Sequence, residues 1–209
     1  MSARTMLLCF LTVLSFVAKS QNFEGKMVFR IAVKSKIPGL ADERLSAMFG
    51  SSQDYFIKGG KYKSLSNGQI IAGQIYDPAT NKIYNKRPGS DTLYWMDAGK
   101  NDDEVTGFEI KKNAETVLGN ACDALILTTK TGTTIYYYNN KYKFDKTKYA
   151  AHKFGNWSFL AAKAGALPLK TVVENSRFKI VMTATEITPM ILTEAMFAIP
   201  SNAPRKMIM

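Results

Sequence analysis

Residues that bind metals or form disulfides are scarce in this chain. Its 209 residues include one histidine, His152, and two cysteines, Cys9 and Cys122. A zinc site of the usual composition would have to be completed by carboxylates from remote segments. A Ser-His-Asp arrangement could use only His152, and no Gly-x-Ser-x-Gly nucleophile elbow occurs in the sequence. The composition therefore argues against a zinc enzyme or a serine hydrolase, and we expect no enzymatic activity and no cofactor.

Long apolar runs are also lacking. The one extended run, 6–17, is interrupted by Thr12 and Ser15, whereas a membrane-spanning helix needs about 20 apolar residues. A positive charge at Arg4 precedes the run and small residues follow it, as in a secretory signal. We therefore predict a signal peptide over 1–20 and a single secreted domain over 21–209. An uncleaved membrane anchor is the alternative.

A lipoprotein signal at Cys9 is a third interpretation of the same segment. A lipidated cysteine should close the apolar run and follow a small residue, but Cys9 follows Leu8 and precedes further apolar residues. Cys9 is more simply an apolar residue of the leader. Its removal would leave Cys122 as the only cysteine, so no internal disulfide could form.

The predicted mature chain is basic. Removal of Arg4 and Lys19 from the 28 basic residues leaves 26 against 17 acidic ones, a net charge of +9. An exported basic protein meets anionic lipid head groups, acidic polysaccharide or solvent more readily than nucleic acid. We therefore expect no nucleic-acid partner, and we include peripheral contact with an anionic membrane surface among the candidate interactions.

Alternation of apolar and polar residues over 23–34 predicts a long half-buried strand. Its inner face would carry Phe23, Met27, Phe29, Ile31 and Val33. Helical spacing predicts amphipathic helices over 37–50 and 156–164, the second with Asn156 as its N-cap. Short runs of strand-forming residues separated by turn pairs predict further strands, which cover 55–57, 69–71, 82–85, 92–96, 105–111, 121–129, 133–139, 141–145, 169–174, 177–187 and 195–199, before a loose basic tail.

These elements predict a mainly β (α+β) fold, because an antiparallel sheet has one apolar face that must be covered. We expect a large curled antiparallel sheet, or an incomplete β-barrel, capped by one or two short helices. A closed barrel or a two-sheet sandwich is the alternative. The capping side chains would be Leu45, Met48 and Phe49 from one helix and Trp157, Phe159 and Leu160 from the other.

Several short motifs resemble an uncharacterised family of small secreted bacterial proteins (DUF4412-like). They are the long early strand, the stretch 114–122 followed by a hairpin, the turn 165–169 and the closing Phe-Ala-Ile-Pro at 197–200. That family is similar in architecture to periplasmic outer-membrane lipoprotein carriers, in which an incomplete barrel encloses an apolar cavity. The resemblance implies a Gram-negative periplasmic or outer-membrane location and binding of acyl chains. It implies no catalytic residues.

Two single residues invite a chemical role, and each has a simpler interpretation. Cys122 lies in a strand that is apolar on both sides, which favours core packing over a reactive thiolate. His152 lies in a lysine-containing segment that we interpret as an exposed connector. The acidic run 102–104 lacks the spacing of a calcium loop, so we predict no metal site.

One strip of the sequence interleaves aromatic rings with cations, over 136–153. Such a strip could seat an anionic amphiphile, or it could be an ordinary half-buried strand. We predict a lipid or lipoprotein acyl chain on the concave face of the sheet; a structural or protein-interaction component of the envelope is the alternative, with an envelope protein as partner. The predicted apolar lining is Phe29, Ile31, Met48, Phe49, Tyr137, Trp157, Phe159 and Leu160, and the predicted head-group ligands are Lys141 and Lys143.

Overall fold

The computed structural model describes residues 22–208, so the predicted signal peptide lies outside the described residues. Strands dominate, as the sequence predicts. The elements are β1 (Gly25–Ser35), α1 (Asp42–Phe49), β2 (Ser52–Lys58), β3 (Lys61–Ser66), β4 (Gly73–Asp77), β5 (Lys82–Lys86), β6 (Leu93–Asp97), β7 (Val105–Val117), β8 (Asn120–Thr129), β9 (Gly132–Lys143), η1 (Lys146–Tyr149), η2 (Phe154–Asn156), α2 (Trp157–Lys163), β10 (Ala166–Asn175), β11 (Phe178–Pro189), η3 (Glu194–Phe197) and β12 (Arg205–Met207).

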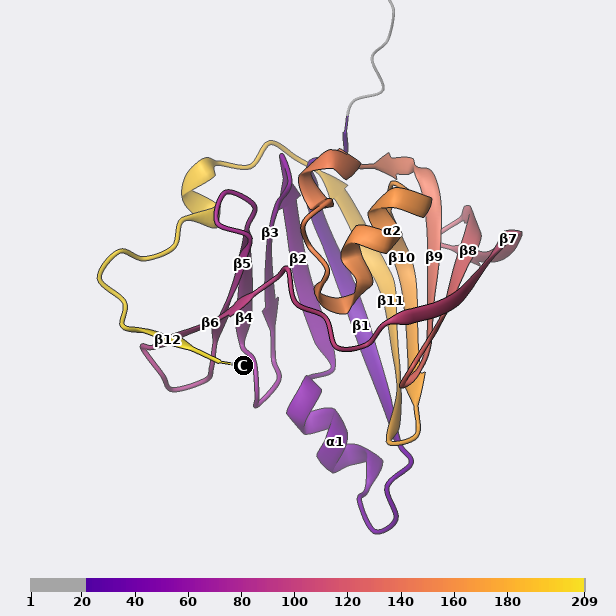
Figure 1. Cartoon of the computed structure of the whole chain (residues 1–209), viewed down its shortest axis with the longest axis horizontal. Coiled ribbons are helices and arrows are strands. Elements are labelled where there is room, and N and C mark those ends of the chain that lie inside the picture. Colours follow the sequence, from indigo (N-terminus) through magenta and orange to yellow (C-terminus); the bar gives the residue numbers. More distant parts are fainter. Residues whose placement is uncertain (1–21, 209) are drawn as a thin grey trace, which may run out of the picture.

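The twelve strands within residues 22–208 belong to one sheet, in the order β12-β6-β5-β4-β3-β2-β1-β11-β10-β9-β8-β7. Neighbouring strands are antiparallel, except that β12 runs parallel to β6. The sheet curls around its inner face without closing (Figure 1). The prediction of a curled antiparallel sheet capped by short helices is confirmed.

The first strand holds the two halves of the sheet together. β1 pairs with β2 on one side and with β11 on the other, and a bulge interrupts the second pairing at Val28/Phe29. Met27, Phe29 and Val33 are buried while Arg30 and Lys34 are exposed. The predicted alternation is therefore confirmed, and the apolar side of β1 forms the centre of the concave wall.

The connection between β6 and β7 crosses the open side of this sheet. It runs below α2 from one half of the sheet to the far edge (Figure 1). The backbone N–H groups of Lys153 and Phe154 donate to the carbonyl of Ala98 at 2.7 and 2.9 Å. The side-chain amide of Asn101 donates to Asn156 at 2.8 Å. These hydrogen bonds hold the crossing segment, residues 98–104, against the residues that precede α2.

The two helices differ in how they meet the sheet. α2 lies over the concave face, where Leu160 is fully buried against strand residues such as Leu125 and Leu127. α1 lies at one end of the sheet (Figure 1) and packs through Leu45 and Phe49, whose ring is 5.6 Å from that of Phe178. The concave face is therefore covered closely under α2 and more openly toward α1.

The core prediction for Cys122 is confirmed, because the side chain is fully buried. Burial raises the pKa of its thiol, which keeps it protonated at neutral pH and a poor nucleophile. Two of the turn pairs that separate the predicted strands, Gly59-Gly60 and Asn175-Ser176, join β2 to β3 and β10 to β11.

Three predicted strand or tail segments differ in the structure. Residues 69–71 form a loop, because the N–H groups of Gln69 and Ile70 donate to carbonyls of α1 instead of a neighbouring strand. The segment predicted as a last strand, 195–199, overlaps the short helix η3, which at four residues is too short for a sequence pattern to identify. The tail predicted to be loose forms β12 against the edge of β6.

Two local predictions around α2 need correction. Asn156 occupies the predicted N-cap position, but it has a left-handed backbone and its side chain makes no cap hydrogen bond to the helix; it accepts the bond from Asn101 instead. His152, predicted to lie in an exposed connector, is 0 % exposed. The lysines around it are exposed. The prediction of exposure was therefore correct for these lysines and wrong for the imidazole.

Candidate functional site

A pocket of about 240 Å³ lies between the inner face of the sheet and α2. We call it the inner pocket. Trp157 of α2 forms one side, and strands from both halves of the sheet form the rest. Its lining is Met27, Phe29, Gln53, Tyr55, Tyr62, Ser64, Gln74, Tyr136, Trp157, Leu167, Pro168, Thr171 and Met182.

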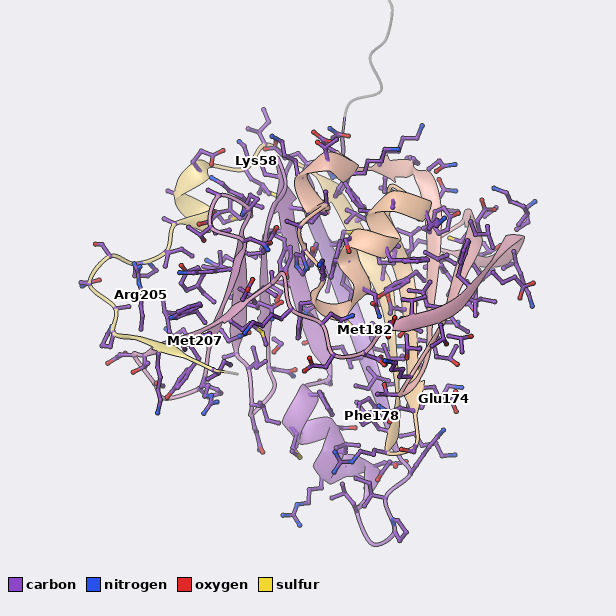
Figure 2. The ribbon with its side chains drawn as sticks, viewed as in Figure 1. Lys58, Glu174, Phe178, Met182, Arg205 and Met207 are labelled. Atoms are coloured by element: carbon purple, nitrogen blue, oxygen red, sulfur yellow. The ribbon has the colours of Figure 1, made fainter. Side chains whose placement is uncertain are left out.

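A second pocket of about 210 Å³, the outer pocket, continues toward α1. Ile70 and Ile71 lie at this pocket and are 42 % and 37 % exposed, so it opens to solvent there. Figure 2 shows Met182 near the middle of the sheet and Phe178 toward the α1 end of the same strand. The lining is Ile31, Met48, Phe49, Gln53, Ser64, Ser66, Ile70, Ile71, Gln74, Ile180 and Met182.

The two pockets adjoin, since Gln53, Ser64, Gln74 and Met182 line both of them. Most of the remaining lining is apolar. Within the described part of the chain, no lysine, arginine, aspartate or glutamate lines either pocket. The site is therefore a continuous uncharged groove that runs from α2 to the opening beside α1.

A cluster of stacked aromatic rings closes the inner pocket. The ring of Tyr62 lies 5.4 Å from Tyr55, 5.3 Å from Tyr76 and 5.7 Å from Trp157. Aromatic contacts of this kind contribute about 0.5–1.5 kcal/mol each beyond the burial of area. Tyr149 also stacks on Trp157, with ring centres 5.4 Å apart. The indole at the pocket wall is thus fixed by its neighbours.

His152 belongs to this cluster. Its Nε2 and the Tyr62 hydroxyl share a hydrogen bond of 3.1 Å, and its ring centre lies 4.3 Å from that of Tyr76. Burial lowers the pKa of His152 to about 4, because desolvation disfavours the charged imidazolium. Its Nδ1 and the hydroxyls of Tyr55 and Tyr149 are buried without a partner. At neutral pH the cluster is therefore uncharged, and it contains three buried polar atoms that make no hydrogen bond to the described residues.

Five of the predicted ligand-binding residues line the groove. Phe29 and Trp157 lie at the inner pocket, and Ile31, Met48 and Phe49 lie at the outer pocket. The fold thus brings together side chains from β1 and both helices. Their role as ligand contacts stays a prediction.

The other predicted site residues lie elsewhere. Leu160 of α2 is buried in the core between the helix and the sheet. Phe159 packs edge-on against Phe108, with ring centres 5.4 Å apart. Tyr137 lies under the ammonium group of Lys170, 5.2 Å from its ring centre, and lines neither pocket. Lys141 and Lys143 are exposed on β9. Neither lines the groove, so the structure does not bring these cations to the predicted acyl site.

Several lining residues were not singled out from the sequence. On β9 the inner-pocket residue is Tyr136, the neighbour of the predicted Tyr137. Two more are Tyr55, which lies two residues from Ile57 on β2, and Tyr62, which lies two residues from Ser64 on β3. Alternation along each strand predicts that the two residues of each pair share a face of the sheet. What the sequence could not supply was the register that places these strands opposite one another.

The described residues contain no cluster of three or more histidine, cysteine or acidic side chains arranged to hold a metal ion. The acidic run 102–104 takes part in loop contacts instead. Asp103 accepts from the N–H of Thr131 at 3.0 Å, and Glu104 pairs with Lys130 at 2.6 Å. Between residues 22 and 208, no helix is long and apolar enough to cross a membrane.

Comparison with known proteins gives remote structural similarity alone. No family model matches the chain, so the predicted resemblance to the DUF4412-like family is unconfirmed. No curated protein matches it. Among solved structures, an uncharacterised conserved protein from Thermus thermophilus has a TM-score of 0.45 and 10% identity, over 87% of this chain and 90% of that one.

Two mycobacterial proteins are also similar in structure. Lipoprotein LppX from Mycobacterium tuberculosis has a TM-score of 0.35 and 8% identity, over 81% of this chain and 89% of its own. LprF from Mycobacterium bovis has a TM-score of 0.31 and 12% identity, over 86% of this chain and 90% of its own. Likenesses this remote assign neither a ligand nor an activity to the present chain.

Proposed function

We propose that this protein binds an apolar or amphiphilic molecule, such as a lipid or a lipoprotein acyl chain, in the groove on the concave face of its sheet. Binding would proceed without chemical conversion of the ligand. The single observation that carries the proposal is the pair of adjoining pockets, lined mainly by apolar side chains and by no charged one in the described chain.

The size of the groove supports this proposal. An engineered apolar cavity of about 150 Å³ accepts benzene, and each pocket here is larger. Neither reaches the lower end of usual ligand sites, about 300 Å³, whereas the two taken together do. Burial of apolar area contributes roughly 25 cal/mol per Å². A hydrocarbon chain laid along both pockets would thus gain affinity from desolvation.

Tryptophan fluorescence offers a direct test, because the chain has only two tryptophans, Trp95 and Trp157, and only Trp157 lines the groove. In the Trp95→Phe variant, a brominated long-chain lipid should quench the remaining fluorescence with a saturable dependence on concentration. The matched control is Trp157→Phe, whose remaining Trp95 should stay unquenched. Equal quenching of both variants, or none in either, would refute binding in the groove.

The proposed setting is the bacterial cell envelope, reached through the predicted signal peptide. Basic residues outside the groove would then favour peripheral contact with an anionic membrane surface, since each cation near such a surface contributes about 1 kcal/mol. Membrane proximity would supply an apolar ligand that is sparingly soluble in water. The surface charge would attract the protein to the membrane, and the uncharged groove would then bury the ligand.

A protein-interaction role is the second candidate, and one feature favours it. β7 is an edge strand that pairs only with β8, and it exposes the apolar side chains of Phe108 and Ile110. An unpaired edge of this kind can add a strand from another protein. Protection of β7 amides from hydrogen exchange when a candidate envelope protein is added would support this role; unchanged exchange would count against it.

A further inference from the structure

A row of uncharged polar side chains crosses the wall of the groove. Tyr55 of β2 lies opposite Ser64 of β3, Ser64 lies opposite Gln74 of β4, and Gln74 lies opposite Asn85 of β5. We call these four residues the polar row. Ser64 and Gln74 line both pockets, so the row crosses the groove where the inner and outer pockets meet.

The polar row retains unused hydrogen-bonding capacity. Ser64 lines both pockets, so its hydroxyl can donate to a ligand there. The Tyr55 hydroxyl is buried and has no hydrogen-bond partner among the described residues. Burial also raises the pKa of Tyr55 well above its ordinary value, so the hydroxyl stays a donor at neutral pH. At the other end of the row, the Gln74 amide donates to Asn85 at 2.9 Å and is thereby oriented.

The cations next to the polar row lie on the other face of the sheet, because Lys63 and Lys86 directly neighbour Ser64 and Asn85 along their strands. Lys26 pairs with Asp54 at 2.9 Å and Lys61 with Glu194 at 2.8 Å, and neither lysine lines a pocket. A carboxylate or phosphate buried in the groove would therefore lack a counter-ion. Burying a charge without a partner is far more costly than burying a neutral hydrogen-bonding group.

Resting on the proposed function, we infer that the groove selects an uncharged ligand that carries a hydrogen-bonding group, of the ester, amide or alcohol class, along its hydrocarbon chain. The oxygen of this group accepts from the Ser64 hydroxyl of the polar row, where the two pockets meet. One hydrocarbon arm then lies over Phe29 and Trp157 in the inner pocket, and the other lies over Ile31 and Phe49 in the outer pocket.

Competition among three probes of similar length tests this selectivity. The protein is loaded with the uncharged fluorophore Nile red, and octyl octanoate, hexadecane and hexadecanoate are each added from cyclodextrin. We expect the ester to displace the dye at a concentration about three- to tenfold lower than the alkane, the gain of one net hydrogen bond. Hexadecanoate should be the weakest competitor.

Variants locate the selectivity. Ser64→Ala should reduce the advantage of the ester over the alkane, while Tyr137→Phe, at a tyrosine outside the groove, should leave it unchanged. Circular dichroism checks that each variant folds, and the three-probe comparison on the unaltered protein remains decisive if one does not. An ester equal to the alkane, or tighter binding of hexadecanoate, would overturn this inference while leaving the proposed function standing. Failure of all three probes would instead overturn the proposed function.

Discussion

At the scale of single residues, His152 shows how a buried aromatic cluster governs protonation. The imidazole is fully buried and shares a hydrogen bond with Tyr62. Its pKa is lowered to about 4, whereas a histidine in the unfolded chain has a pKa of about 6.5. Between these values the unfolded state binds a proton that the folded state does not, so stability rises with pH across this window.

We therefore predict that the free energy of unfolding falls by about 2 kcal/mol as the pH is lowered from about 7.5 to about 5. Chemical denaturation at a series of pH values measures this change. The chain has a single histidine, so NMR can follow its imidazole without overlap. In the control variant His152→Gln, the slope over this range should disappear even if overall stability changes. A wild-type slope retained by the variant would assign the effect to other groups.

Leu160 provides a second prediction at this scale. Its side chain is fully buried among Leu125, Leu127 and Tyr138, and shortening such a residue removes contacts and leaves a cavity. We expect Leu160→Ala to lower the free energy of unfolding by about 2–5 kcal/mol, measured by urea denaturation. Leu118→Ala, at an exposed position of the β7–β8 turn, should change it by less than about 0.5 kcal/mol. Similar losses in both variants would contradict the assigned burial.

At the scale of elements, the junction after α1 depends on a glycine. Gly50 ends the helix with a φ of 87°, and a Cβ there would lie 2.7 Å from the side-chain oxygen of Asn67. The same oxygen accepts from the N–H of Ser51 at 2.8 Å. α1, the start of β2 and the loop after β3 therefore meet at a point that tolerates no side chain.

Gly50→Ala should consequently lower the free energy of unfolding by roughly 2–4 kcal/mol, since this positive-φ, extended-ψ backbone is strained for alanine and the new Cβ displaces Asn67. Thermal and urea unfolding measure the loss. The matched control is Gly89→Ala, which has a φ of +68° but no atom near the added Cβ, and which should cost about 1 kcal/mol. Equal costs would show that the crowding around Gly50 has no consequence.

Local sequence patterns predicted an element correctly where the alternation of apolar and polar residues continues over many residues. β1 alternates over eleven residues, and both its position and its inner face agree with the prediction. The loop at 69–71 and the short helix η3 were mistaken for strands. In each case a few residues fit either conformation, and hydrogen bonds to α1 or within one turn decided the outcome.

The candidate site was only partly predictable for a different reason. Phe29 and Trp157 were identified because they lie on strongly apolar faces of their elements. Tyr137 was chosen over Tyr136, although β9 turns Tyr136 toward the groove. Choosing between neighbours requires the register of β9 against β8 and β10, which pairings distant in sequence determine. The polar row depends on four such strands and has no signature within any one of them.

At the scale of the whole molecule, charge and cavity are separated. The chain carries a formal net charge of +11, yet no charged side chain lines the groove in the described region. We predict that raising salt from about 0.05 M to about 0.5 M abolishes co-sedimentation with anionic vesicles, because ions screen the surface charges. Ligand affinity in the groove should change by less than about twofold.

Parallel titrations measure the two effects on one sample, with vesicle sedimentation for the first and Nile red fluorescence for the second. Vesicles of neutral lipid are the control and should bind weakly at every salt concentration. Vesicle binding that resists salt would indicate insertion of apolar residues instead of surface attraction. A strong loss of dye affinity with salt would place a charge inside the groove.

The sheet described above ends in two edges, β7 and β12, that are not bonded to each other. In a closed barrel the number of strands and their stagger fix the diameter. Here no such closure fixes the width; α2 lies over the concave face, and the segment 98–104 crosses the open side. A small change in strand twist, distributed over many pairs, would widen the interior without breaking any backbone hydrogen bond. The open edges therefore predict a groove that accepts ligands of different width with similar affinity.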